Sequence, residues 1–351
     1  MTGDAGAAYF AEIREQPQAL ERLLGRMPEI DAVAKQLVAH APTIVRLVGH
    51  GTSDNAASYG VYAFGLLPAW TALRDSISLT TYYDAPLDFA HSAVVALSQS
   101  GRTPDVVEYV VRARAGGAFT VALTNEPESE LAHAADVVVA LEAGPERAVA
   151  ATKTYVNELA TLALLAAAVA GRGPEFEDGV RSVAGLLADA LEPLARSTRA
   201  LATAFAYVGR LYAIGRGLEY ATAREVALKL TETCRVAAEP LTATDLVHGP
   251  VAAVDPLFPV WTIASDDAAL PMAVEAAKRV LAAGGMLVAS GNAAGAIRGA
   301  SYTLPVPAAP NPVLAPLLSV LPGQLFAGAL ALAKGLDPDR PVGLTKVTLA
   351  S

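Results

Sequence analysis

The order of apolar and polar positions divides this chain into alternating helices and strands. Apolar residues recur at helical spacing through the first forty residues, and after them short apolar runs alternate with helical stretches. The apolar runs predict strands at 43–49, 91–99, 119–125, 136–142, 210–217, 258–266, 286–291 and 301–307. Strands that alternate with helices predict an α/β fold, in which parallel sheets are covered by helices on both faces.

The same α/β unit is used twice, with a charged helical stretch between the two series of strands. We therefore predict two tandem three-layer α/β/α domains. The expected segments are an N-terminal helical segment at 1–40, a first domain at 41–172, a helical connector at 173–200, a second domain at 201–335 and a tail at 336–351.

Two apolar stretches resemble membrane spans. The stretch at 159–171 is too short to cross a bilayer, and the uncharged run at 313–333 is interrupted by Pro316, Pro322 and Gln324. We interpret both as buried helices and expect no membrane partner.

Composition limits the class of protein. Hydrophobic residues make up 53% of the 351 residues and charged residues 17%, which is typical of a globular chain of about two domains. The formal net charge of -9 disfavours binding to nucleic acid. Cys234 is the single cysteine and the N-terminus has no signal segment, so we expect a cytoplasmic protein. The five histidines lack metal-ligand spacing, and we expect neither a metal nor a cofactor.

Two polar loops follow the first and second predicted strands: "VGHGTSDN" at 48–55 and "LSQSGRTPD" at 97–105. Ligands of parallel sheets bind at the carboxyl ends of strands, where helix N-termini present free N–H groups. Hydroxyl and amide side chains in such loops favour a compact phosphate over a dinucleotide. The candidate phosphate-binding residues are Ser53, Ser98, Gln99, Ser100 and Thr103. The alternative is that they only cap helices, as Thr103 before Pro104 is suited to do.

The second half repeats the architecture without this chemistry. Its counterpart of the second loop is "TIASDDAAL", in which Asp266 and Asp267 would repel a phosphate. We therefore expect one phosphate site, in the first half.

Titratable residues gather in the second half. Glu225, Lys229 and Glu232 share one face of a predicted helix, either as a solvated ion pair or as a buried pair that tunes an acid or base. His248 lies in the loop "DLVHGP", where it is either structural or able to transfer protons near neutral pH. Lys346, five residues from the C-terminus, is at a position where most lysines are solvated.

Taken together, these motifs resemble the sugar isomerase (SIS) family in its tandem form, and most of all the isomerase half of glucosamine-6-phosphate synthase and the related deaminases. The resemblance runs nearly end to end through "GHGTS", "SQSGRTPD", "AATKTY", "GRGLEYATAREVALKLTE", "EPLTATDLVHGP" and "LAKGLDPDRPVGLTKVTLAS". Any one of these segments is weak evidence, whereas their order and spacing together are specific.

The resemblance implies roles for individual residues. Glu232 matches the family's catalytic glutamate, Lys229 its helix lysine, His248 its ring-opening histidine, and Lys346 the lysine that forms a Schiff base with the open sugar. The phosphate loops fall on the five candidates given above. The sugar-binding positions implied by the resemblance are Gly51, Thr52, Val149 and Ala151. The family's histidine comes from the neighbouring subunit, which implies a homodimer with shared sites.

Departures from the family pattern narrow the expected activity. Residue 2 is Thr2 where the synthase has a nucleophilic cysteine, and we expect no glutamine-hydrolysing domain. Arg102 stands where a glutamate is usual and Ala151 where a serine is usual, which affects sugar specificity.

The first hypothesis is a glucosamine-6-phosphate deaminase that yields fructose 6-phosphate and ammonia. The alternatives are a fructosamine-6-phosphate deglycase, a deaminase/isomerase of another amino-sugar phosphate, and a non-catalytic sugar-phosphate sensor.

Overall fold

The computed structural model describes residues 5–346, and these residues form two five-stranded parallel sheets flanked by helices. The chain divides into two compact units. The first-sheet unit is built from Gln18–Glu146, Lys153–Arg181 and the tail from Thr345, and the second-sheet unit from the N-terminus to Pro17, Arg147–Thr152 and Ser182–Leu344. The predicted α/β fold of two tandem domains is confirmed.

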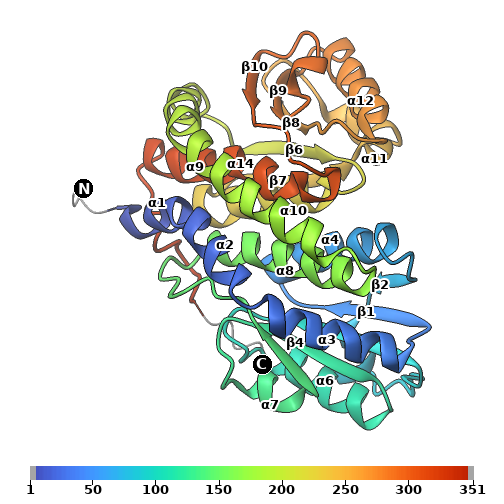
Figure 1. Cartoon of the computed structure of the whole chain (residues 1–351). Helices are drawn as coiled ribbons and strands as arrows, with labels where there is room; N and C mark the ends of the chain where they lie inside the picture. Colours follow the sequence, from blue (N-terminus) through green and yellow to red (C-terminus); the bar gives the residue numbers. More distant parts are fainter. Residues whose placement is uncertain (1–4, 347–351) are drawn as a thin grey trace. The chain divides into compact units, whose positions relative to one another are not determined.

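The first sheet has the order β2-β1-β3-β4-β5. Its strands are β1 (Ile44–Val48), β2 (Ala72–Arg74), β3 (Ser92–Leu97), β4 (Phe119–Thr124) and β5 (Val137–Ala140). The helices of this unit are α2 (Gln16–Leu24), α3 (Met27–His40), α4 (Thr52–Leu66), α5 (Ile77–Thr81), α6 (Pro104–Ala115), α7 (Glu130–Ala134) and α8 (Lys153–Val169). Helices α5, α6 and α7 pack on one face, while α3, α4 and α8 pack together on the other (Figure 1).

Alternation along β1 explains these two layers. Val48 belongs to the core under α6, whereas the neighbouring Leu47 points to the other face, where it contacts Gly60 of α4. Both residues are buried. Strands that are apolar on both faces are expected in a parallel sheet with helices on each side.

The second sheet has the order β10-β9-β8-β6-β7. Its strands are β6 (Arg210–Gly215), β7 (Ala237–Thr242), β8 (Pro259–Ile263), β9 (Met286–Gly291) and β10 (Tyr302–Pro305). The helices of this unit are α1 (Ala7–Arg14), α9 (Gly173–Ala204, which begins in the other unit), α10 (Glu219–Cys234), α11 (Ala243–Val247), α12 (Leu270–Ala282), α13 (Ala315–Ser319) and α14 (Leu321–Ala333), with 3-10 turns η1 (Pro250–Ala253), η2 (Ala294–Ala296) and η3 (Pro312–Leu314).

Two strands were missed from the sequence, and both lie at an edge of their sheet. Strand β2 has three residues, and β7 contains Pro240. An edge strand tolerates proline because one side of its backbone has no ladder partner, and it needs no continuous apolar run. The buried helix expected at 313–333 is also divided into η3, α13 and α14.

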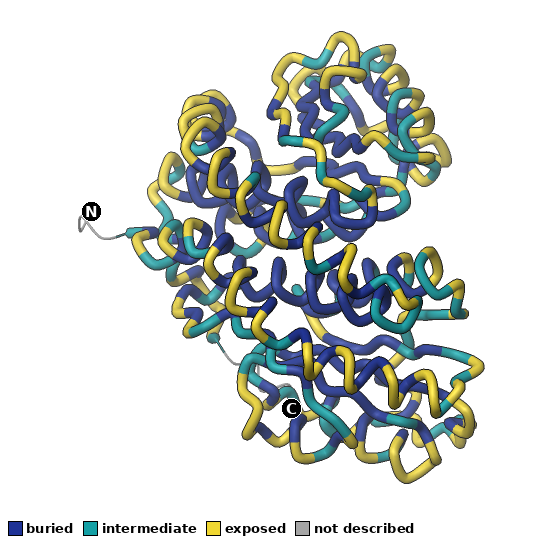
Figure 2. Tube along the Cα trace, viewed as in Figure 1, coloured by how far each residue is buried: buried dark blue, intermediate teal, exposed yellow. Residues whose placement is uncertain are grey.

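The apolar stretch Pro312–Ala333 is the one described segment that is long and apolar enough to cross a membrane, and its most apolar 18 residues are entirely buried inside the fold. Figure 2 shows α14 buried along most of its length. Trp261 of β8 packs against Phe326 of α14, with ring centroids 4.9 Å apart and the ring planes tilted by 54°. The stretch therefore fills the core of the second-sheet unit, as predicted from its prolines and Gln324.

Close packing of α14 against α10 depends on Gly323. A Cβ atom at Gly323 would lie 2.2 Å from the Cγ2 atom of Val226 on α10, whereas a Cβ atom at Gly185 in α9 would meet nothing within 4 Å. Both glycines lie within helices. Substitution of each glycine by alanine therefore distinguishes the cost of crowding, expected only at Gly323, from the intrinsic helix preference of alanine, expected at both positions.

We predict that Gly323→Ala destabilises the protein by about 1–3 kcal/mol, because the added methyl group forces α14 away from α10. Gly185→Ala should instead stabilise it by roughly 0.5–1 kcal/mol, since alanine favours the helix and nothing is crowded. Urea unfolding followed by far-UV circular dichroism measures both. Equal effects of the two substitutions would contradict the packing described here.

Candidate functional site

Each sheet contains one pair of neighbouring strands from which the chain leaves in opposite directions. In the first sheet these are β1 and β3, paired in register with Val48 beside Ala96. The two hydroxyl-rich loops begin directly after these residues. The reversal of strand order places them together at the position where open α/β sheets bind ligands.

The loop after β3 is a tight turn that gathers two candidate hydroxyls. The Ser98 and Thr103 hydroxyl oxygens lie 3.2 Å apart, and Ser98 Oγ accepts the Gly101 N–H at 3.1 Å. Gly101 has a φ of +61°, and a Cβ atom there would lie 1.9 Å from Ser129 Oγ, so only glycine fits. Thr103 is in the N-cap position of α6, but its side chain makes no capping hydrogen bond. Simple capping therefore does not account for this hydroxyl.

The other two candidates of this loop are less enclosed. The Ser100 hydroxyl accepts the N–H of Arg102 at 3.3 Å, and its side chain is partly exposed. The Gln99 carbonyl accepts the N–H of Asn125 at 3.1 Å, which ties the loop backbone to the end of β4. The Gln99 side chain is partly exposed. Both side chains can reach a ligand without unfolding the turn.

The loop after β1 starts α4, with Gly51 at the N-cap and Thr52 and Ser53 in the first turn. Ser53 is buried, and its hydroxyl donates to Glu158 Oε1 on α8 at 2.6 Å. Because a hydroxyl has one proton, Ser53 offers a ligand an accepting oxygen as long as this bond is kept. Glu158 was not singled out from the sequence.

A polar cavity of about 350 Å³ borders the loop after β1 in the first-sheet unit. Gly49 and His50 line it together with Asp54 and Arg74, which form an ion pair at 2.6 Å. The ion pair neutralises the charge of Arg74, so this arginine is not free to bind an anion. The cavity leaves room for a small polar molecule beside the loop.

Lys346 of the tail is an ordered part of the first-sheet unit. Its Nζ lies 3.6 Å from Oε2 of Glu146, whose side chain is fully buried. Glu146 also accepts the N–H of Thr154 at 3.3 Å, at the start of α8. The side chain of Lys346 is 27% exposed, so it is less solvated than most lysines this close to a chain end. A buried carboxylate anchors it.

The titratable cluster of the second-sheet unit lies on α10. Lys229 Nζ is 2.6 Å from Glu232 Oε2 and 3.4 Å from Glu225 Oε1. The side chains of Lys229 and Glu225 are fully buried, whereas that of Glu232 is 23% exposed. The interpretation as a solvated ion pair is therefore wrong for Lys229 and Glu225, and Glu232 is the member of the cluster that solvent can reach.

His248 ends α11, a short helix whose start is fixed by a capping box between Thr242 and Asp245. Its side chain is exposed, and its ring has no hydrogen-bond or charged partner among residues 5–346. Gly249 follows with a φ of +151°. The structure thus presents His248 on a defined turn at the surface of its unit.

The second sheet reverses its strand order between β6 and β8. A buried glutamate fills the space between the loops that follow these two strands. Glu219, at the start of α10 after β6, accepts hydrogen bonds from Ser265 after β8 and from Thr222 at 2.6 Å. Burial raises the pKa of Glu219, the hydroxyls of Ser265, Thr222 and Ser319 oppose the rise, and the charge of Asp267 adds to it. This buried acid occupies the place that the phosphate loops hold in the first sheet.

The candidate residues are thus divided between the two units. The first-sheet unit holds both hydroxyl loops and Lys346, while the second-sheet unit holds Lys229, Glu232 and His248. The sugar-binding positions Val149 and Ala151 also lie in the second-sheet unit, where the Val149 N–H donates to the Asp339 carbonyl at 3.1 Å.

Comparison with protein families gives two matches to the SIS domain, at residues 38–168 and 205–334. The chain belongs to the SIS domain family. It is similar to glutamine–fructose-6-phosphate aminotransferase (isomerizing) of Pyrococcus horikoshii, with 33% identity over 99% of this chain and 58% of that protein. The same enzyme of Aeropyrum pernix shares 34% identity over 97% of this chain and 57% of its own length. The SIS chain spans little more than half of each relative.

Solved SIS structures give the same answer. The C-terminal domain of the aminotransferase of Francisella tularensis superposes with a TM-score of 0.87, at 26% identity over 95% of this chain and 98% of that one. Glucosamine-6-phosphate deaminase of Thermotoga maritima superposes with a TM-score of 0.79 at 20% identity, covering 98% of this chain and 100% of that one. The superposition on the Thermotoga maritima structure shows that the two chains share a fold.

The buried acid of the second sheet predicts a pH dependence of stability. A carboxyl whose pKa is raised in the folded state contributes its full stability below the ordinary glutamate pKa of about 4.3 and loses it as the pH rises towards the folded value. Glu219→Gln removes this titration. We expect the wild-type protein to lose more free energy of unfolding between pH 5 and pH 8 than Glu219→Gln does, as measured by urea unfolding at each pH.

The matched control is Glu275→Gln, which removes an exposed carboxylate of α12 in the same unit. It should keep the pH dependence of the wild-type protein. If Glu219→Gln and Glu275→Gln lost stability equally between the two pH values, Glu219 would not titrate as its burial requires.

Proposed function

We propose that this SIS protein is an amino-sugar phosphate deaminase/isomerase, which converts glucosamine 6-phosphate and water into fructose 6-phosphate and ammonia. The observation that carries the proposal is the partly exposed Glu232 carboxylate, held 2.6 Å from the buried ammonium of Lys229. A fixed carboxylate with access to solvent suits a general base, and the ammonium stabilises the negative charge that develops on an enolic oxygen.

The phosphate would be bound in the first-sheet unit. The turn at Ser98 and Thr103 offers hydroxyl donors next to the N-terminus of α6, where the helix dipole favours an anion. Gln99 and Ser100 extend the proposed phosphate site, and Ser53 completes it when its hydroxyl turns from Glu158 to donate to the phosphate. Gly51, Thr52, Val149 and Ala151 are proposed to contact the sugar.

The reaction then follows from proton transfers. His248 moves a proton between the ring oxygen and O1, which opens the hexose to its aldehyde. Glu232 removes the proton from C2 and returns one to C1, which gives the 2-imine of fructose 6-phosphate. Neither step needs a metal ion or an oxidant, because the carbon skeleton is only isomerised. The sequence-based expectation of no cofactor is consistent with this proposal.

Lys346 would release the ammonia. Its neutral amine adds to C2 of the imine, the C2–nitrogen bond to ammonia breaks, and water then hydrolyses the new Schiff base to the ketose and free lysine. An ammonium group cannot attack carbon, so the lysine must first give up a proton. Glu146, 3.6 Å from its Nζ, is the neighbouring group that accepts the proton.

The proposed enzyme is a cytoplasmic homodimer with shared sites, and it acts on a small sugar phosphate rather than on nucleic acid or a membrane. The exposed His248, whose ring has no partner among the described residues, supports a role at the surface of a second subunit. The net charge of -9 argues against a nucleic-acid partner.

The first experiment is to incubate the purified protein with glucosamine 6-phosphate and measure ammonia and fructose 6-phosphate, with no glutamine or metal added. We expect both products in equal amounts. Release of glucose 6-phosphate and an amine from fructosamine 6-phosphates alone would favour a deglycase, and turnover of another amino-sugar phosphate would change the sugar. Binding without turnover of any of these would favour a sensor and contradict the proposal.

Substitution of the proposed base gives a second prediction. Glu232→Gln should lower kcat by roughly a hundredfold to ten-thousandfold, because the amide cannot accept the C2 proton, while KM changes little. Glu225 remains 3.4 Å from Lys229 in this variant, so the buried ammonium keeps a charged partner. Initial rates over a range of glucosamine 6-phosphate measure both constants.

Glu275→Gln on α12 serves as the control for the loss of one carboxylate from this unit. It should leave kcat and KM unchanged. Wild-type kcat in Glu232→Gln would show that another group is the base.

A further inference from the structure

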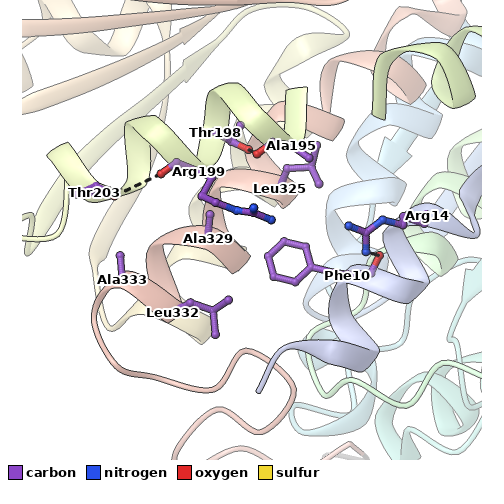
Figure 3. Close-up of a pocket in the computed structure, with 10 residues that line it drawn as sticks. All are labelled: Phe10, Arg14, Ala195, Thr198, Arg199, Thr203, Leu325, Ala329, Leu332 and Ala333. Atoms are coloured by element: carbon purple, nitrogen blue, oxygen red, sulfur yellow. Dashed lines mark hydrogen bonds between the residues drawn. The ribbon is translucent and has the colours of Figure 1, made fainter. Parts of the chain in front are cut away.

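The second-sheet unit has a second cavity that none of the residues assigned above lines. Its volume is about 290 Å³, and it lies between α1, α9 and α14. Figure 3 shows Phe10 and Arg14 of α1, Arg199 of α9, and Ala329 and Leu332 of α14 around it. The volume lies at the lower end of the range of small-molecule pockets, which is roughly 300–1,000 Å³.

The walls of this cavity are held in place by hydrogen bonds. Asp339 accepts the N–H groups of Ala8 and Tyr9 at 3.1 and 2.7 Å, which fixes the N-terminus of α1. The Tyr9 hydroxyl donates to the Gln324 carbonyl at 3.1 Å and joins α1 to α14. The cavity is therefore a preformed feature of the packed helices and needs no movement of the chain to open.

The interior of the cavity is apolar. Leu325 and Ala329 of α14 are buried, and Thr198 of α9 donates its hydroxyl to the Leu194 carbonyl at 2.8 Å. Thr203, the other threonine of the lining, donates its hydroxyl to the Arg199 carbonyl at 3.5 Å, so both hydroxyls are satisfied within α9. A ligand gains by placing apolar atoms against this interior, and it has no polar group there to bind.

Two guanidinium groups lie at one end of the cavity. Figure 3 shows the Arg199 side chain extending towards the cavity and that of Arg14 beside Phe10. Arg199 has no ion pair among residues 5–346, and Arg14 contacts Glu192 at 3.5 Å, with both side chains at least half exposed. Arg199 therefore brings a guanidinium group without an ion pair among the described residues to this end of the cavity, in a chain of net charge -9.

We propose that this cavity is a binding site for a small apolar carboxylate, whose hydrocarbon part packs on α14 while its carboxylate pairs with Arg199 and Arg14. A planar guanidinium pairs with a planar carboxylate through two parallel hydrogen bonds. The proposal is independent of the proposed function, since Glu232, His248, Lys346 and the phosphate loops do not line the cavity.

The test is isothermal titration calorimetry of the full protein with octanoate, and with octanamide as the uncharged analogue. We expect saturable binding of octanoate and binding of octanamide that is weaker by at least about tenfold. Arg199→Gln should weaken octanoate binding by roughly tenfold, because it removes a charge-assisted hydrogen bond. Ala329→Leu should abolish binding by filling the cavity.

Arg196→Gln is the matched control, since Arg196 is exposed on the same helix and does not line the cavity. It should bind octanoate like the wild-type protein. Arg199→Gln replaces an exposed side chain, so it keeps the test valid if Ala329→Leu fails to fold. The site would be refuted by no saturable binding up to about 10 mM octanoate, by equal loss in Arg199→Gln and Arg196→Gln, or by displacement of octanoate by glucosamine 6-phosphate.

Discussion

The reversal of strand order in each sheet is the constraint on which the rest of this structure depends. Because the chain leaves β1 towards one edge of the first sheet and β3 towards the other, the loops after these two strands have no helix of their own packed between them. The same holds for β6 and β8 in the second sheet. Each SIS domain thus provides one place where two loops and two helix N-termini meet, and the side chains at that place decide what it does.

The two domains fill this place in opposite ways. In the first sheet Ser98 and Thr103 present hydroxyls beside a glycine turn, whereas in the second Glu219 bonds to Ser265 and Thr222 and closes the space with a buried acid. The charge of nearby Asp267, which also raises the pKa of Glu219, makes the second place still less suited to an anion because it repels one. The two copies of the fold therefore contain one proposed phosphate site, in the first domain. The titratable cluster lies on α10 of the second domain.

Sequence patterns predicted what depends on local order and missed what depends on distant contacts. The long buried strands and the loops after them follow from apolar periodicity and turn residues, whereas β2 and β7 lie at sheet edges, where that periodicity fades. Glu158 and Glu146 were missed because their partners, Ser53 and Lys346, are distant in the sequence. A single carboxylate at the start of the apolar helix α8 was the available signal for Glu158, since such a group is buried only with a partner.

Electrostatics on α10 favours Glu232 rather than Glu225 as the proposed general base. The ammonium of Lys229 is fully buried and needs at least one carboxylate to offset its desolvation. Glu225, equally buried and 3.4 Å away, can serve that purpose without contact with solvent. Glu232 is then the additional carboxylate, closer to the ammonium but open on its other side, so it can take up and release a proton without leaving Lys229 unpaired. In the proposed mechanism Glu225 pairs with the buried lysine, and Glu232 transfers the proton.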